Sequence, residues 1–366
     1  MSRGYTPSLV VSSCTVLQKT RRLPLPGEIL VQEGQTVRAE DVVAKAQRPG
    51  RLSIVHATSR LGLDPADLDK ALRVRPGDMI QQGDLLAEVH GLWGLFRGHC
   101  LSPVSGQVEY ASNTTGHLGI RMAPVPVQIQ AFIDGVVLQR LGNEGVVLQG
   151  HGALIQGIYG WGGERRGVLC MADSLDSIAG LKDQERVLFY PRSLTDAEIP
   201  EIQNLSHLAA ILVAGVPNSI LKRLCDPNQW PDPRQVPTLI LTDGFGQMEM
   251  DRRVVRILEK LQGRVASVDG TTRIRAGVVR PEIFVSLSPS EPSASEAHSH
   301  VPGSLQVDSR VRVLTYPNFA AHATVLQLPE EPCLIESGSL VRVAHVRLDT
   351  GEVRTVPRAN LEVIVD

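Results

Sequence analysis

The phrase Glu33-Gly34-Gln35-Thr36-Val37, followed by Asp41-Val42-Val43-Ala44, decides the fold because the chain repeats it. The second copy reads Pro76-Gly77-Asp78-Met79-Ile80, followed by Gly83-Asp84-Leu85-Leu86-Ala87. The turn glycine and the closing alanine stand at 34 and 44 in one copy and at 77 and 87 in the other, so the spacing is the same. A turn glycine, an apolar step, a second turn and a short apolar strand are typical of one half of a small quasi-symmetric β-barrel. Because neither half can bury its apolar face alone, we expect the copies to pack on each other, with these residues in the core: Val37, Val43, Ile80 and Leu86.

The composition is that of a soluble globular protein built mainly from strands. The 366 residues suffice for two or three domains, with 42% hydrophobic and 21% charged residues. Glycine (33) and proline (24) are frequent and aromatic residues make up only 4%, which suits a turn-rich β protein. A net charge of −2 provides no general attraction to nucleic acid or to an anionic membrane.

The sequence favours a cytoplasmic protein without a transmembrane segment. No apolar run approaches the roughly 20 residues that cross a bilayer, and the stretch from Met1 to Val16 lacks the pattern of a secretory signal. The five cysteines are odd in number, scattered and never arranged as Cys-x-x-Cys. We therefore expect reduced, mostly buried thiols.

Residues 1–130 read as short strands between turn signals, interrupted by one helical insertion. Asp64 followed by Pro65 predicts the N-cap and the first residue of a short helix within residues 61–72. Further on, Ser102-Pro103-Val104-Ser105-Gly106-Gln107-Val108 predicts a proline-started strand that a glycine turn interrupts.

Residues 24–121, with the repeated phrase and the Ser102–Val108 segment, resemble the biotinyl/lipoyl-type barrel-sandwich hybrid. The resemblance is greatest to the version at the start of the C subunit of Rnf-type electron-transport complexes. Asp134-Gly135-Val136-Val137, then Glu144-Gly145-Val146-Val147, reads as a further, degenerate echo.

A carrier domain of this kind needs an acceptor lysine at the tip of an exposed hairpin. Lys45 follows the first copy without the flanking methionine or acidic residues of carriers, and the second copy has no lysine at this place. We therefore expect neither covalent biotin nor covalent lipoate. The scattered cysteines exclude the usual iron–sulfur ligation, so the resemblance implies a fold and not redox chemistry.

Residues 131–287 change to the pattern of an α/β domain with a mostly parallel sheet. Apolar strands are predicted at 186–191, 209–215 and 237–242, and the last two end in glycine loops that lead into helices. The second of these helices, within 248–261, carries apolar residues at helical spacing: Met250, Val254, Ile257, Leu258 and Leu261.

Residues 288–305 form a Pro/Ser-rich stretch that reads as a disordered linker, and residues 306–366 form a small SH3-like barrel. Strands are predicted at 309–315, 323–328, 339–348, 353–356 and 361–365. Val311-Arg312-Val313 and Pro357-Arg358-Ala359-Asn360 resemble the KOW-type modules of ribosome and transcription factors. Phosphate binding needs clustered positive charge, but residues 306–366 contain six arginines, no lysine and eight acidic residues. We therefore expect the module to bind protein rather than nucleic acid.

Other chemistries lack their motifs. Gly160-Trp161-Gly162-Gly163 does not have the spacing of a dinucleotide-binding loop, and its glycines fit a tight turn. His298 and His300 lie in the predicted linker, and His90, His99, Cys100 and His117 match no zinc spacing. We therefore expect no metal and no cofactor, and without a nucleophile–base pair we assign no catalytic residue.

One segment of the middle domain is a candidate anion site, because ligands bind at the carboxyl ends of parallel strands. Asp243, Gly244 and Gly246 follow a predicted strand and precede a helix start. Three arginines follow further along the chain, where alternation in a strand would place the first two on one face: Arg273, Arg275 and Arg280. They either hold a phosphate or carboxylate, or form ion pairs with Asp243, Asp269 or Glu282.

The chain therefore reads as a multidomain, β-rich adaptor that binds one or more protein partners. The alternative is an enzyme or regulator that binds an anionic metabolite or nucleotide in the middle domain.

Overall fold

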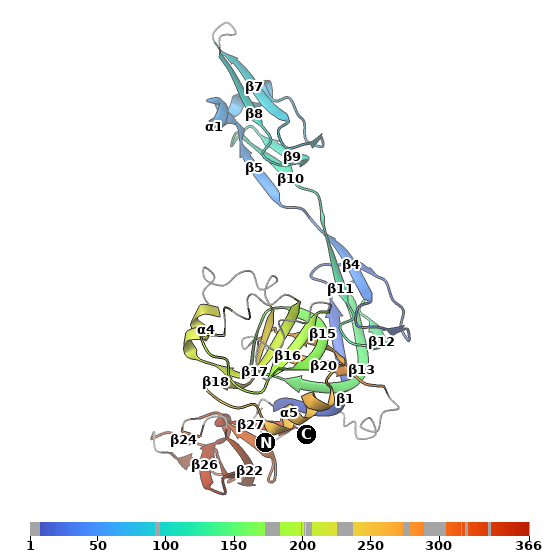
Figure 1. The fold of residues 1–366 in the computed structure, drawn as a ribbon. Helices are drawn as coiled ribbons and strands as arrows, with labels where there is room; N and C mark the ends of the chain where they lie inside the picture. Colours follow the sequence, from blue (N-terminus) through green and yellow to red (C-terminus); the bar gives the residue numbers. More distant parts are fainter. Residues whose placement is uncertain are drawn as a thin grey trace.

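The repeated phrase folds in the same way twice, in two parts of the molecule that lie far apart (Figure 1). This computed structural model describes residues 8–91, 96–172, 184–198, 200, 202, 207–224, 237–273, 279–288, 305–315, 317–318, 321–335 and 338–365. The predicted β-rich class is confirmed. The described residues form a body, two lobes that we call A and B, and a C-terminal unit.

Lobe A contains the first copy of the phrase and a segment that is distant in sequence. Its strands are β2 (Glu28–Ile29), β3 (Thr36–Val37), β4 (Val42–Arg48), β11 (Val125–Gln130), β12 (Gly135–Arg140) and the first part of β13 (Gly145–Gln156). Val37 and Val43 are buried there together with Ile133, Val146 and Leu148. Residues 131–148 therefore belong to lobe A and not, as predicted, to the α/β domain.

Lobe B contains the second copy and is inserted between β4 and β11 of lobe A. Its strands are β5 (Leu52–His56), β6 (Met79–Ile80), β7 (Leu85–Gly91), β8 (Phe96–Leu101), β9 (Gly106–Ser112) and β10 (His117–Arg121). Its helices are α1 (Ala57–Leu61), the 3-10 helix η1 (Pro65–Asp67) and α2 (Leu68–Ala71), so the predicted helical start after Asp64 is confirmed. Two extended segments, residues 47–52 and 121–126, form a neck that holds lobe B away from the body (Figure 1).

The expectation that the two copies pack on each other is wrong, although all four predicted core residues are buried. Ile80 and Leu86 lie in the core of lobe B, whereas Val37 and Val43 lie in the core of lobe A. Each copy instead pairs with a second half of its own. The equal spacing reflects a lobe architecture that occurs twice in the chain. Because lobe B is inserted into lobe A, phrases that are close in sequence lie in different cores.

Backbone hydrogen bonds show that the two lobes share one pairing pattern. Gly34 N–H donates to the Val137 carbonyl at 2.8 Å, and Gly77 N–H donates to the Val108 carbonyl at 2.7 Å. Likewise Leu30 N–H donates to Val43 and Arg73 N–H to Leu86, both at 2.9 Å. In these bonds residue 34 matches residue 77, and residue 137 matches residue 108. The offset differs from strand to strand, since residue 149 matches residue 121 and residue 18 matches residue 52. The echo at Asp134–Val137 is thus the second half of lobe A.

The body is one large mixed sheet, in which the predicted parallel strands are neighbours. β15 (Glu164–Met171), β16 (Arg186–Tyr190), β17 (Leu208–Val216) and β18 (Thr238–Phe245) run parallel in that order. Antiparallel neighbours complete it: β1 (Ser8–Arg22), β13, β14 (Tyr159–Trp161), β19 (Val265–Asp269) and β20 (Glu282–Ser286). Every residue of β17 is buried, as expected for a strand covered on both faces.

Helices α4 (Asn218–Leu224) and α5 (Arg252–Lys260) accompany the parallel strands. The Asp251 side chain caps α5 by accepting a hydrogen bond from Arg253 N–H at 2.7 Å. Val254, Ile257 and Leu258 form the buried face of α5, which confirms the apolar periodicity seen in the sequence.

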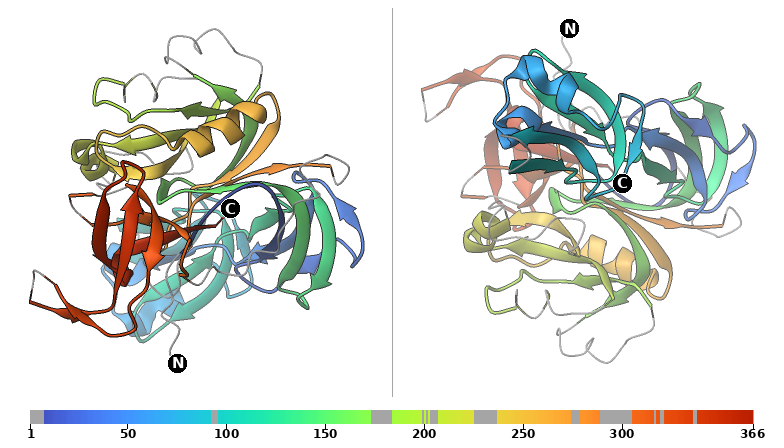
Figure 2. Two further views of the ribbon diagram at one scale, coloured as in Figure 1. Left: turned by 90° about the horizontal axis from the view of Figure 1, so that it is seen from below. Right: turned by 90° about the horizontal axis from the view of Figure 1, so that it is seen from above.

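The C-terminal unit contains the predicted strands and extends the sheet of the body. They are β21 (Arg310–Val313), β22 (His322–Gln327), β25 (Val343–Leu348), β26 (Val353–Pro357) and β27 (Leu361–Val365), with a hairpin of β23 (Cys333–Leu334) and β24 (Leu340–Val341) and the 3-10 helix η5 (Arg358–Asn360). β27 pairs in parallel with Ser8–Val10 at the start of β1. The unit therefore lies against the body, as Figure 2 also shows, although residues 289–304 of the predicted linker fall outside the described residues.

Candidate functional site

The predicted anion site lies where the body meets the C-terminal unit. Asp243 and Gly244 belong to the end of β18, and Gly246 follows it. Gly244 and Gly246 have φ values of +151° and +107°, a backbone conformation that favours glycine. The turn that the sequence placed after this strand is therefore present.

An ion network from the C-terminal unit covers this strand end. The Arg312 guanidinium is buried, donates to the carboxylate of Glu362 at 2.5 and 3.1 Å, and also donates to the carbonyls of Thr242 and Asp243, both at 3.3 Å. Arg280 donates to the other oxygen of Glu362. Buried charges of this kind persist because each is paired and hydrogen-bonded. The carboxyl end of β18 is therefore a contact between units.

Asp243 has an unusual environment for a carboxyl group. Burial raises its pKa above the ordinary value, while the hydrogen bond from the Thr242 hydroxyl (2.6 Å) and the Arg312 charge act in the opposite direction. The nearest Arg312 nitrogen lies 3.9 Å from the Asp243 carboxylate. The Asp243 carboxyl group thus faces Arg312 of the C-terminal unit.

Of the three sequence-predicted arginines, the two that the structure describes have different surroundings. Arg280 forms an ion pair, as one alternative held, but with Glu362 rather than with Asp243, Asp269 or Glu282. Those last two carboxylates lie beside Lys19 instead. Arg273 is exposed and bridges Val279 through backbone hydrogen bonds of 2.9 and 3.0 Å, and Arg275 lies outside the described residues.

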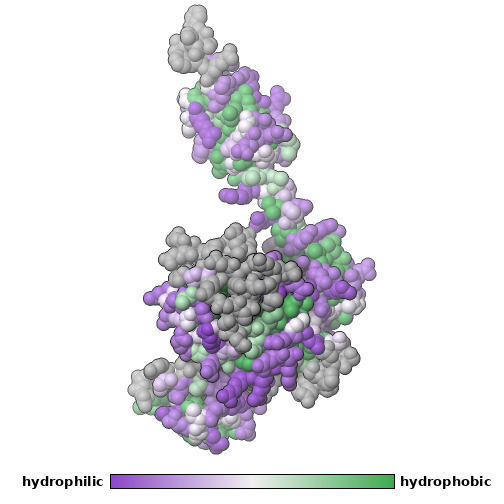
Figure 3. All heavy atoms as spheres, in the orientation of Figure 1, coloured by the Kyte–Doolittle hydropathy of each residue, from purple (hydrophilic) through white to green (hydrophobic). Residues whose placement is uncertain are grey.

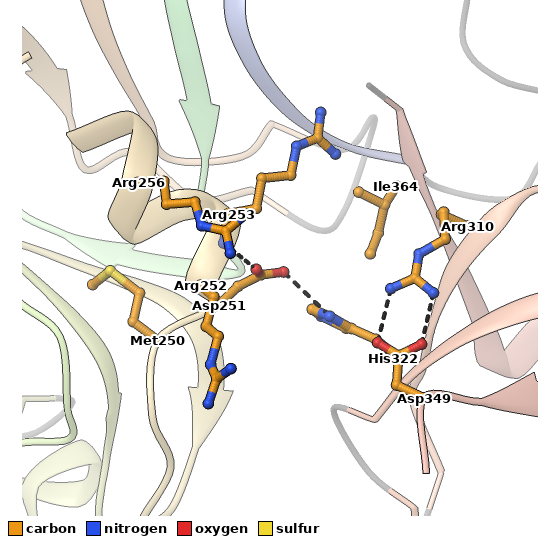
Figure 4. Close-up of a pocket in the computed structure, with 9 residues that line it drawn as sticks. All are labelled: Met250, Asp251, Arg252, Arg253, Arg256, Arg310, His322, Asp349 and Ile364. Carbon is orange, nitrogen blue, oxygen red and sulfur yellow. Dashed lines mark hydrogen bonds and ion pairs between the residues drawn. The ribbon is translucent and has the colours of Figure 1, made fainter. Parts of the chain in front are cut away.

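A pocket of about 400 Å³, which was not predicted from the sequence, lies between helix α5 and the C-terminal unit (Figure 4). Helix α5 and the C-terminal unit line it with Met250, Asp251, Arg252, Arg253, Arg256, Arg310, His322, Asp349 and Ile364. The lining includes four arginines and two aspartates, an excess of two positive charges without counting His322. The sequence signal was the arginine-rich start of α5, of which only the apolar face was interpreted.

Both acidic groups of this pocket are already engaged. The Asp349 carboxylate accepts two hydrogen bonds from Arg310, at 2.7 and 2.9 Å, and the neighbouring guanidinium holds the pKa of Asp349 below its ordinary value. The Asp251 carboxylate lies 3.2 Å from His322 Nδ1. The first turn of α5 has no acidic residue and instead carries Arg252 and Arg253, although cations are unfavourable at a helix N-terminus. The start of α5 therefore adds positive charge to a pocket whose two carboxylates already have partners.

The carrier-type residues do not form a modification site of the expected shape. Lys45 lies within β4 and pairs with Glu28 at 3.1 Å. In lobe A the connection that would form the hairpin tip leads through the neck into lobe B. The absence of biotin and lipoate stays a prediction.

The remaining negative findings concern the described residues alone. Among them, no group of three or more His, Cys, Asp or Glu residues could hold a metal ion, and His298 and His300 lie outside this part of the chain. Cys14 and Cys100 are buried and, like Cys170 and Cys333, form no disulfide, whereas Cys225 is outside the described residues. In the part of the chain that the structure describes, no helix has the length and apolar character needed to cross a membrane.

Comparison with protein-family models and with curated proteins gives no match to this chain. The functional argument therefore depends on the geometry of the lobes and of the pockets.

Proposed function

We propose that the protein is a non-catalytic adaptor, and that lobe B presents a protein-binding surface away from the body. The duplication supports this proposal because lobe A provides an internal reference for lobe B. Residues at matched positions have the same backbone pairing, so a difference between their side chains reflects a difference in surroundings or in function.

Exposed apolar residues of lobe B stand where lobe A has polar ones. Met79, with 77% of its surface exposed, matches Thr36, since each pairs with the strand that closes its own lobe. By the same register, Leu52 matches Gln18, Ile54 matches Thr20 and Leu101 matches Gln130. The four lobe A residues are exposed as well. Figure 3 shows apolar residues at the surface of lobe B and of the neck.

Contiguous exposed apolar surface on a soluble protein typically marks an interaction site. A lobe carried on a neck also leaves a partner free to approach from several sides. Lobe A also exposes Leu30, Val136 and Leu138, but each only to 39–42%, so the observation that carries the adaptor proposal is the 77% exposed Met79 of lobe B.

Affinity purification of the full chain from its native cell tests the proposal. The decisive variant gives lobe B the residues of lobe A, with Met79→Thr, Leu52→Gln and Ile54→Thr. The control variant removes apolar surface from lobe A, with Val136→Thr and Leu138→Thr, both exposed residues. We expect mass spectrometry to find a stoichiometric partner that the first variant loses and the control retains. Full retention by both variants, or no partner at all, would contradict the proposal.

A second candidate function is the binding of an anionic metabolite or nucleotide. The site would be the pocket between helix α5 and the C-terminal unit. It is supported by the arginine excess in that pocket. Calorimetric titration with inorganic phosphate and with nucleotides tests it. We expect saturable binding that Arg252→Gln with Arg256→Gln abolishes. The matched control is Arg342→Gln with Arg347→Gln, two exposed arginines outside the pocket; equal loss in both variants would indicate only general charge attraction.

A further inference from the structure

An open groove lies where lobe B joins the neck. It has a volume of about 780 Å³, and its apolar walls include Pro49, Met79, Met122 and Pro124. Met79 and Met122 are exposed to 77% and 37%. Gly106, the first residue of β9, and Ser105 before it also line the groove.

The matching place on lobe A is filled by a strand of the same chain. Ser105 and Gly106 correspond to Asp134 and Gly135, and Asp134 contacts β20. There the Ser286 hydroxyl accepts from Asp134 N–H at 3.2 Å, and Leu287 N–H donates to the His151 carbonyl at 2.9 Å. Ser286 also pairs with Gly152, and Phe284 is buried in the core of lobe A.

The two glycines confirm that these places correspond. A Cβ atom on Gly106 would lie 2.2 Å from the Arg121 carbonyl oxygen, and one on Gly135 would lie 2.0 Å from the Gln149 carbonyl oxygen. Arg121 and Gln149 are themselves matched residues. Counting on along the chain, Met122, Ala123 and Pro124 match Gly150, His151 and Gly152. Of these, Gly152 pairs with Ser286 of β20, and the His151 carbonyl accepts from Leu287 N–H.

From this correspondence, and resting on the proposed adaptor function, we infer that the groove binds an extended, apolar peptide segment of a partner protein, placed as residues 284–287 are placed on lobe A. Addition of a strand beside an existing one is a common mode of peptide recognition. The difference is that lobe A is completed by its own chain, whereas lobe B is completed by a partner.

The lining of the groove defines the chemistry of the segment. Arg121 donates to Glu109 and to the Gly50 carbonyl, so its charge is already compensated. Methionine side chains are flexible and polarisable, and they adapt to apolar side chains of several shapes. Gln47 and Gln81 are among the lining residues, and a glutamine amide can both donate to and accept from a peptide backbone. An uncharged segment with apolar side chains therefore fits best.

Selection from a phage-displayed library of random octapeptides on the immobilised full chain tests the inference. We expect enrichment of uncharged, apolar peptides, and at least about a tenfold weaker binding of their synthetic copies to Met79→Gln with Met122→Gln. The control is Leu334→Gln with Leu340→Gln, two exposed apolar residues of the C-terminal unit, which should bind the peptides normally. Both groove residues are exposed, and thermal melting establishes that the variants are folded.

Failure of the inference is distinguishable from failure of the adaptor proposal. If no peptide is enriched, if the enriched peptides are charged, or if the groove variant binds them normally, the groove is not a peptide site. A native partner that still co-purifies with the groove variant would then leave the adaptor proposal standing. Light scattering that shows a dimer, lost in the groove variant, would assign the groove to a second copy of the chain and overturn the inference.

Discussion

Glu362→Gln tests whether the buried ion network holds the C-terminal unit on the body. Glu362 is 1% exposed and receives hydrogen bonds from both Arg280 and Arg312. Glutamine keeps the size of the side chain and removes its charge. Arg312, only 2% exposed, would then keep two backbone carbonyls and the Asp243 carboxylate at 3.9 Å.

The expected cost follows from burial. Removing one partner of a buried ion pair costs about 3–5 kcal/mol, because the remaining charge is left in a medium that solvates it poorly. Because the nearby Asp243 carboxylate and the two carbonyls still compensate part of the Arg312 charge, we expect a loss of stability at the lower end of this range, about 3 kcal/mol. With a urea slope of about 3 kcal/mol per molar, the unfolding midpoint should fall by about 1 M.

The assay is urea unfolding followed by circular dichroism, together with hydrogen exchange of β18 and β27. Glu352→Gln is the control, since Glu352 pairs with Arg354 at 2.6 Å but both side chains are about half exposed. Such a pair contributes about 0–1 kcal/mol. Equal small losses in the two variants, with unchanged exchange in β18 and β27, would refute the reasoning.

Four further predictions follow from the same geometry. Burial raises the folded-state pKa of Asp243 above its ordinary 3.8. The protonated carboxyl group therefore contributes its full stabilisation of the fold below pH 3.8, and this contribution is lost as pH rises through the raised pKa. Urea unfolding at a series of pH values should therefore show wild type losing stability relative to Asp243→Asn over this window, and a constant difference would contradict it. Leu86→Ala should cost about 2–5 kcal/mol, and its effect should add to that of Val43→Ala because the two residues lie in separate cores; a coupling energy above about 0.5 kcal/mol between them would indicate a shared core. Gly106→Ala should destabilise lobe B by about 1–3 kcal/mol, since its Cβ would meet a backbone oxygen, and hydrogen exchange confined to lobe B would show it. The intact mass of native protein should show no biotinyl or lipoyl group on Lys45, and an added mass there would disprove that expectation.

Much of the local structure was predictable because short segments encode it. The Asp64–Pro65 pair predicted the N-cap and first residue of η1, and the spacing of Val254, Ile257 and Leu258 predicted the buried face of α5. The apolar run in β17 predicted a strand that is buried on both faces. Helix caps and apolar periodicity depend on residues a few positions apart, so the secondary structure that they specify depends little on distant parts of the chain.

The candidate site was predicted only in part. Asp243 lies at a strand end beside a buried arginine, but the arginine is Arg312 of the C-terminal unit. Arg280 and its partner Glu362 are 82 residues apart, and no local pattern connects them. The sequence allowed an anion to be bound or an ion pair to form, and only the packing of two units selected the pair.

The amino-acid sequence by itself determined that the Gly34 and Gly77 phrases fold alike, because turn glycines and alternating apolar residues specify the same strand–turn–strand unit. It also determined that Val37, Val43, Ile80 and Leu86 are buried. The tertiary structure decided which half each phrase packs against, because an apolar face can be covered by any complementary face that the topology brings near. Here the insertion of lobe B separated the two phrases, so each is buried in a different core.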